Sequence, residues 1–106
     1  MPKYLLQVNY VGDGVKGLLK DGGKKRRAAA EKAIKSLGGK LESFYFAFGD
    51  TDAYVIGEAP DNVTMAALAL TVTASGAARV KTVVLMTPEE LDAASKMTPS
   101  YKPPGQ

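Results

Sequence analysis

Five residues in strand-like stretches of the sequence are the best suited to bind a ligand or to take part in a reaction. They comprise two amides, two phenols and a carboxylate: Gln7, Asn9, Tyr45, Tyr54 and Glu58. A few polar groups on a partly apolar wall are typical of a small-molecule pocket. A glutamate buried in such a pocket would have a raised pKa, so Glu58 is the candidate general base and the one candidate catalytic residue. The alternative role for all five side chains is hydrogen bonding across a dimer interface.

A second candidate is a pair of carboxylates, Asp50 and Asp52, in the turn that follows Gly49. Oxygen ligands of this kind suit Mg²⁺ or Ca²⁺, but no third acidic residue lies nearby in the sequence. Aspartate in a turn commonly accepts hydrogen bonds from nearby backbone. We therefore expect a turn motif of Gly49, Asp50 and Asp52 in which Asp52 has a positional role, and no metal site.

A third candidate is the basic run 22–27, in which two glycines precede four Lys/Arg residues. Free N–H groups at a helix start attract anions, so Gly22, Gly23 and Arg26 form a candidate anion site. The spacing matches neither a phosphate-binding loop nor a dinucleotide fingerprint. No nucleic-acid-binding motif accompanies the charge, so nucleic acid is not an expected partner. The alternative is a solvated helix face.

The amino-acid composition excludes several classes of catalytic and metal site. The chain has 106 residues, 45% of them hydrophobic and 24% charged, which is typical of one soluble globular domain. It contains no cysteine and no histidine, which excludes disulfides, cysteine nucleophiles, Ser-His-Asp triads and histidine-ligated haem. The net charge is +3, but residues 16–40 hold nine Lys/Arg and only two Asp/Glu.

The elements that must position these residues follow from periodicity and capping. Alternating patterns predict strands over 4–11, 40–48, 53–59 and 79–86. Helices are expected over 15–20, 24–37 and 63–75, with Gly38-Gly39 ending the second and Asp61 capping the third. A short terminal helix begins at Thr87-Pro88, with Glu90 completing a capping box. The order β-α-β-β-α-β predicts an α+β, ferredoxin-like sandwich with a short C-terminal helix.

Strand alternation also predicts what each sheet face carries. Phe44, Phe46 and Phe48 should point into the core. The opposite face should carry Gln7, Asn9, Leu41, Ser43, Tyr45, Tyr54, Ile56 and Glu58, with either Lys81 or Thr82 from the last strand. This face is too apolar for water and too polar for a dry core, so we expect it to pair with a second copy in a homodimer or higher homo-oligomer.

Several short runs together resemble a known family, the GYD domain family. They are 38–45 (GGKLESFY), 48–52 (FGDTD), 59–61 (APD) and 74–76 (ASG), with Thr82 and with Gly22-Gly23 followed by Arg26. The resemblance covers about residues 3–95. One difference is that the family commonly has tyrosine before the aspartate of the turn, where this chain has Thr51. The turn also resembles that of effector-binding domains in leucine-responsive transcription regulators.

The resemblance implies a dimeric α+β barrel, in which two ferredoxin-like sheets pack together and enclose a cavity. It implies no particular activity. No cofactor is expected. Three functions stay open: a small-molecule-binding or sensory homodimer without catalytic machinery, a cofactor-independent mono-oxygenase or isomerase, and an assembly or regulatory module. Fold relatives do not share one function.

The remaining expectations concern organisation and location. Residues 1–97 should form the domain, and the proline-rich stretch 98–106 a flexible tail or an arm that docks on a neighbour. The N-terminus lacks the pattern of a signal peptide, and no apolar run is long enough to span a membrane. The expected compartment is the cytoplasm, without a membrane partner.

Overall fold

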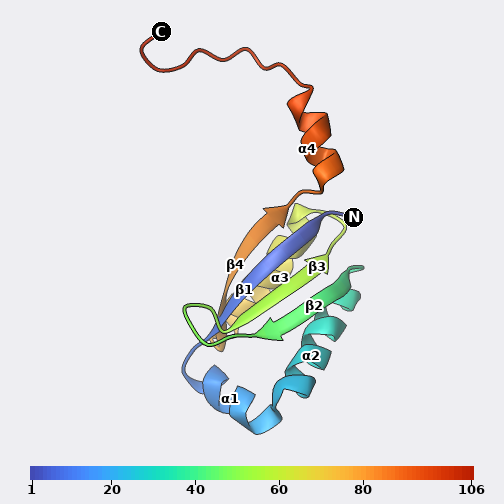
Figure 1. Cartoon of the computed structure of the whole chain (residues 1–106). Helices are drawn as coiled ribbons and strands as arrows, with labels where there is room; N and C mark the ends of the chain where they lie inside the picture. Colours follow the sequence, from blue (N-terminus) through green and yellow to red (C-terminus); the bar gives the residue numbers. More distant parts are fainter.

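The computed structural model describes all residues 1–106, and it places one antiparallel sheet against a layer of helices (Figure 1). The elements in chain order are β1 (Lys3–Tyr10), α1 (Asp13–Asp21), α2 (Gly23–Ser36), β2 (Lys40–Phe46), β3 (Ala53–Glu58), α3 (Asn62–Ala74), β4 (Ala78–Leu85) and α4 (Pro88–Ser95). The strand order is β2-β3-β1-β4, which is the ferredoxin-like topology predicted from the sequence.

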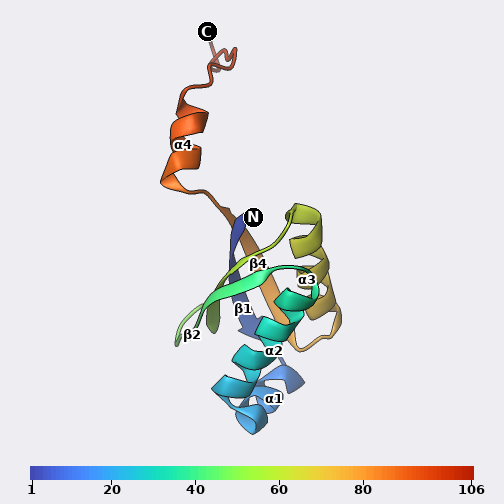
Figure 2. The same cartoon turned by 90° about the vertical axis from the view of Figure 1, so that its right-hand side faces the viewer.

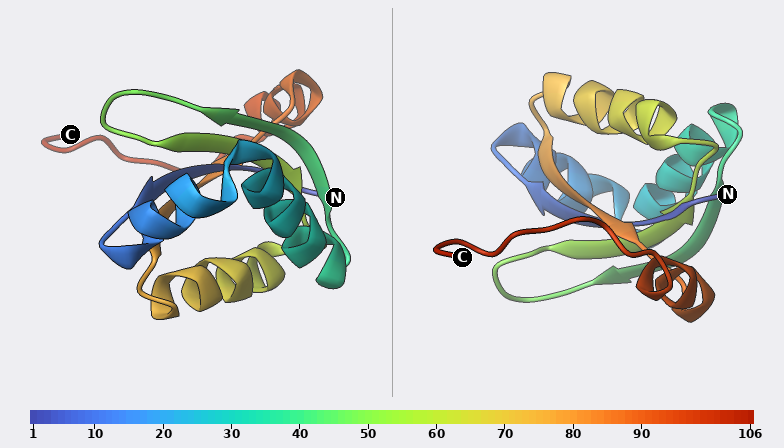
Figure 3. Two further views of the ribbon diagram at one scale, coloured as in Figure 1. Left: turned by 90° about the horizontal axis from the view of Figure 1, so that it is seen from below. Right: turned by 90° about the horizontal axis from the view of Figure 1, so that it is seen from above.

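Helices α2 and α3 cover the same face of the sheet, and α1 extends that layer beyond the end of the strands (Figures 2 and 3). The other face of the sheet is left open. Helix α4 and the terminal stretch project away from the body of the domain (Figure 1). None of the four helices is long and apolar enough to cross a membrane.

The core lies between the sheet and these helices, where alternate strand residues are buried. Tyr4, Leu6 and Val55 from the sheet meet Ile34 of α2 and Met65 of α3. The Tyr4 hydroxyl donates a 2.6 Å hydrogen bond to Asn62 Oδ1, which satisfies the one polar atom of this large buried side chain.

Two of the predicted side-chain positions are wrong, one within β2 and one in the turn that follows it. Leu41 pairs with Gly57 and packs against the core, because Glu42 is an extra bulged residue before Ser43 resumes pairing with Ile56. A bulge of one residue changes which face the preceding side chains occupy. Phe48 is fully exposed rather than buried, because β2 ends at Phe46 and Phe48 lies in the turn. Phe46 lies on the predicted face, but at the end of the strand it is 44% exposed.

The register of β4 shows which of Lys81 and Thr82 lies on the open face of the sheet. Gln7 pairs with Lys81, and Leu6 pairs with Thr82. Lys81 therefore shares the open face with Gln7, whereas Thr82 lies on the helix-covered face.

Glycines end the two helices that precede β2. Gly22 separates α1 from α2 with φ +81°, and its carbonyl accepts the Arg26 N–H at 3.3 Å. Gly38, with φ +80°, ends α2 as predicted, and the N–H of Gly39 returns to Ile34 O at 3.0 Å. A positive φ is readily adopted only by glycine, so these residues fix where the helices stop.

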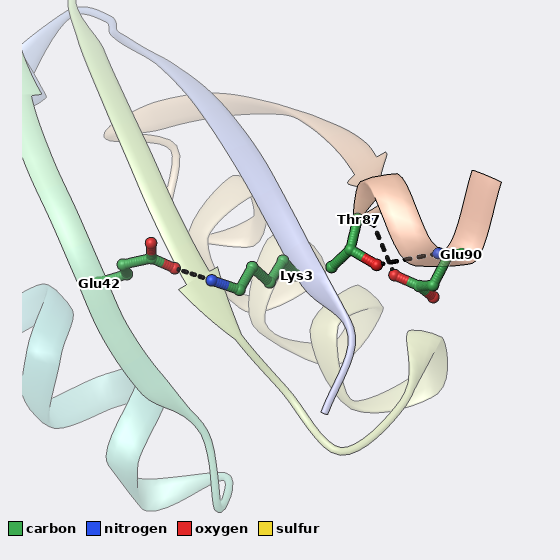
Figure 4. A network of polar contacts seen from close by, with 4 residues as sticks. All are labelled: Lys3, Glu42, Thr87 and Glu90. Atoms are coloured by element: carbon green, nitrogen blue, oxygen red, sulfur yellow. Dashed lines mark hydrogen bonds and ion pairs between the residues drawn. The ribbon is translucent and has the colours of Figure 1, made fainter. Parts of the chain in front are cut away.

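Side-chain caps begin the last two helices. In α4, Thr87 Oγ1 accepts the Glu90 N–H at 3.1 Å and Glu90 Oε1 accepts the Thr87 N–H at 2.9 Å, which is the predicted capping box (Figure 4). Figure 4 also shows the 2.8 Å ion pair from Lys3 to Glu42, the bulged residue. The hydrogen bond to Glu42 raises the pKa of Lys3.

Asp61 caps α3 as predicted, and this cap should make stability depend on pH. The Thr64 hydroxyl and N–H donate to Asp61 Oδ1 at 2.7 and 2.8 Å and hold the pKa of Asp61 below its ordinary 3.8. Because the folded pKa is lowered, the stabilisation is present above the unfolded pKa and is lost as the pH falls through the folded value. Urea unfolding at pH 7 and below about pH 4 should show that acid lowers the free energy of unfolding less for Asp61→Asn than for the native chain.

Asparagine also caps helices well, so this variant should match the native protein at neutral pH. An equal decrease in the free energy of unfolding of the two proteins at acid pH would contradict this role of Asp61. Titration of the other carboxylates is common to both proteins and cancels in the comparison.

Candidate functional site

Three of the residues predicted to bind a small molecule form one row across the open sheet face. Tyr45 of β2 lies opposite Tyr54 of β3, and Tyr54 lies opposite Gln7 of β1. Lys81 of β4 completes the row. Tyr45 is 71% exposed in the single chain, so the two phenols and the amide form an accessible surface rather than a pocket.

The other two residues of that set lie at opposite ends of the face. Glu58 pairs with Lys3 on β1, whereas Asn9 lies six residues farther along the same strand and pairs with Arg79. Six residues of strand span about 20 Å. The structure therefore does not bring the five residues together around one small ligand.

The turn before β3 is organised by Asp52. Its carboxylate accepts the Tyr10 N–H at 3.0 Å, and its own N–H donates to Val8 O and Asn9 Oδ1, each at 3.0 Å. Asp50 is exposed and forms no side-chain hydrogen bond or ion pair, and no group of three acidic residues comes together in the chain. The contacts of Asp52 are those of a residue that holds the end of β1 in place.

These contacts predict different costs for two neighbouring substitutions. Asp52→Ala would leave the partly buried Tyr10 N–H without its acceptor, so we expect the free energy of unfolding to fall by about 1–3 kcal/mol. Asp50→Ala should change it by less than about 0.5 kcal/mol. Denaturant unfolding of the two variants measures both values. Equal losses in the two variants, or stabilisation by Mg²⁺ of the native protein but not of the variants, would contradict the positional role.

A cavity with an almost entirely hydrophobic lining lies on the covered side of the sheet, between the strands and helices α2 and α3. Its volume is about 260 Å³, and fourteen of its fifteen lining residues are hydrophobic. The floor includes Leu6 and Val8 of β1, Val55 of β3 and Phe44 of β2, and Leu68 and Val72 of α3 form part of the wall. For comparison, an engineered cavity of about 150 Å³ binds benzene, and ligand pockets commonly begin near 300 Å³.

Small side chains are the reason that this space is not filled. On α2 the cavity is lined by Ala29, Ala30 and Ala33, and α3 and β4 contribute Ala69 and Ala78. Protein interiors normally pack as densely as organic crystals, and a helix facing a sheet usually presents leucine-sized residues. Alanine at five positions around one volume leaves room that the chain itself does not occupy.

Arg26 is the one charged residue of the cavity lining. It lies on the same face of α2 as Ala29, Ala30 and Ala33, at helical spacing. Its guanidinium carbon is 5.9 Å from the centre of the Tyr10 ring, which is within the range of a cation–π interaction. Its Nε is buried without a hydrogen-bond partner, and no carboxylate of the chain forms an ion pair with it.

The predicted anion site is divided between neighbouring cavities. Gly22 and Gly23 line a shallow cavity under Phe46 and Phe48, whereas the Arg26 side chain lines the apolar cavity and a third one toward α1. Tyr10 borders all three. The Arg26 N–H donates a hydrogen bond to the Gly22 carbonyl, but the Arg26 side chain lines an apolar cavity that the two glycines do not line.

Sequence reasoning missed this cavity. Alanine is a strong helix former, so the alanines of α2 indicated a helix and carried no information on the space in front of them. The available signal was the helical spacing that places the small residues Ala29, Ala30 and Ala33 on the same face as Arg26. The lining residues of the four principal cavities include none of Gln7, Asn9, Tyr45, Tyr54 and Glu58.

Comparison with known proteins gives one finding. A family model described as GYD domain matches residues 4–95, which is most of the chain. No curated protein matches, and no solved structure matches. The family match agrees with the runs of sequence that resemble this family and spans every element from β1 to α4. The chain therefore belongs to the GYD domain family.

Proposed function

We propose that this protein is a small-molecule-binding homodimer in which each copy holds its ligand between the sheet and helices α2 and α3. The observation that carries the proposal is the 260 Å³ cavity, whose lining is hydrophobic apart from Arg26. Burial of apolar ligand surface in a preformed cavity supplies binding free energy without a change of fold. This position differs from the sheet face on which sequence reasoning placed the ligand.

The open sheet face is the proposed contact between copies. A row of Val83, Leu5 and Ile56 runs across its centre, next to the row that contains Tyr54 and Tyr45. Apolar and aromatic side chains surrounded by charged ones are typical of protein interfaces. Pairing of two such faces would cover the tyrosines that the single chain leaves exposed.

Binding rather than catalysis is favoured by the groups that the cavity offers. Its lining contains a guanidinium and a phenol, Arg26 and Tyr10, and no carboxylate. Glu58, the candidate general base, lies on the open face in the row of Lys3 and Lys40. General base catalysis needs a proton acceptor within hydrogen-bond reach of the substrate, and Glu58 is on the wrong side of the sheet for a ligand in this cavity.

A neutral apolar probe tests the proposal. In a ¹H–¹⁵N NMR titration with 1-octanol, we expect saturable shifts for amides around the cavity, including those of Ala30, Ala33 and Leu68. Amides of the open face, such as that of Tyr54, should shift little. Linear, unsaturated shifts at all these positions would contradict a binding site between the sheet and the helices.

A further inference from the structure

The site proposed above also indicates the chemical class of its ligand. Resting on that proposed function, we propose that the cavity between the sheet and helices α2 and α3 binds an apolar monocarboxylate, whose carboxylate pairs with Arg26 and whose apolar body lies against the alanine face of α2. The inference depends on three properties of the cavity: an unpaired donor, a single positive charge and a limited volume.

The unpaired donor belongs to Arg26. A buried N–H without an acceptor costs about 1–3 kcal/mol, so chains usually provide a partner for it. Here Nε has none, and neither ion pair of the chain involves Arg26. A guanidinium presents Nε–H and a terminal N–H in parallel, which matches the two oxygens of a carboxylate. A ligand carboxylate beside Tyr10 would supply the missing acceptor once rotation of the Arg26 side chain exposes Nε to the cavity.

The charge around the site favours an anion with one negative charge. Lys24, Lys25 and Arg27 surround Arg26 in the sequence of α2, which makes this end of the helix strongly basic. Asp13 and Asp21, however, line the adjoining cavity on the far side of Arg26. These carboxylates would repel the second charge of a phosphate monoester, whereas a monocarboxylate can be neutralised by Arg26 alone.

The volume sets the size of the apolar part. A cavity of about 150 Å³ holds the six carbons of benzene, so 260 Å³ holds about ten non-hydrogen atoms. Octanoate has about that number, as does an arylpropanoate such as 3-phenylpropanoate. The shared chemistry is therefore a carboxylate on a short alkyl or aryl body.

Calorimetric titration of the full-length protein with octanoate, 3-phenylpropanoate and 1-octanol tests this inference. Arg26→Gln removes the charge, and Arg27→Gln is a matched control because Arg27 is exposed, lies on the same helix and lines none of the four principal cavities. We expect Arg26→Gln to weaken carboxylate binding at least about tenfold relative to 1-octanol binding, and Arg27→Gln to leave that ratio unchanged.

Comparison of the ligands separates the possible failures. A native protein that binds 1-octanol but neither carboxylate would overturn the ligand class and leave the proposed function standing. The same carboxylate-to-octanol ratio in Arg26→Gln as in the native protein would overturn the role of Arg26. A protein that binds none of the three probes would overturn both proposals. Preference for octanoate over 3-phenylpropanoate, or the reverse, distinguishes an alkyl from an aryl ligand within the supported class.

Discussion

Replacement of Ile56 by arginine is expected to convert the proposed dimer to monomers, with self-association weakened at least about 100-fold. Ile56 lies on an internal strand of the sheet, between Ser43 on β2 and Leu5 on β1. In the proposed dimer this position is at the centre of the contact, where a buried charge without a partner carries the largest penalty. Sedimentation velocity over a range of micromolar concentrations measures the effect.

Leu70→Arg is the matched control for Ile56→Arg. Leu70 is an exposed apolar residue on the outer side of α3, so it introduces the same charge on the helix layer, away from the open face. This variant should remain dimeric, and both variants should keep the circular dichroism of the native chain. A native protein that sediments as a monomer, or an Ile56→Arg variant that stays dimeric, would contradict the assignment of the interface.

The second large effect is expected when the cavity is filled from within. Ala33 lines the cavity on α2, so Ala33→Leu adds three carbons to a space that the chain leaves empty. We expect the ligand-free protein to gain about 0.5–2 kcal/mol of stability, because the new side chain buries apolar surface in existing space. The same change should weaken 1-octanol binding at least about tenfold, since the ligand and the leucine compete for one volume.

Ala28→Leu provides the control on the same helix. Ala28 is exposed and lines none of the four principal cavities, so leucine there should change neither the stability nor the binding by much. Thermal unfolding with and without 1-octanol compares the two variants. Destabilisation by Ala33→Leu together with unchanged binding would mean that the cavity does not hold the ligand.

The elements of this fold were predictable because their signals are local. Asp61 and Thr87 cap helices through hydrogen bonds to residues three positions away, and Gly38 ends α2 through its own φ angle. Strand alternation was equally informative for β1 and β3. It was wrong at Leu41, because the extra residue Glu42 places Leu41 on the same face as Phe44 rather than on that of Ser43.

The candidate site was less predictable, because it depends on the distance between layers. Alternation correctly brings Gln7, Tyr54 and Tyr45 into one row, but it does not show whether a surface is flat or hollow. The cavity arises from alanines on α2 that face the sheet. Helix propensity does not distinguish these alanines from others, and only the face that they share with Arg26 marks them in the sequence. The sequence grouped Arg26 with Gly22 and Gly23 in one candidate anion site, but these glycines line a different cavity from the one that Arg26 lines.

Native mass spectrometry of protein purified from its own host tests the central claim, that a homodimer binds a small apolar ligand in each copy. The expected spectrum shows two 11.2 kDa chains together with one retained small molecule per chain. Mild activation should release that molecule, and Ala33→Leu purified in the same way should lack it. A native protein with no retained mass, and with none acquired on incubation with 1-octanol or octanoate, would contradict the claim.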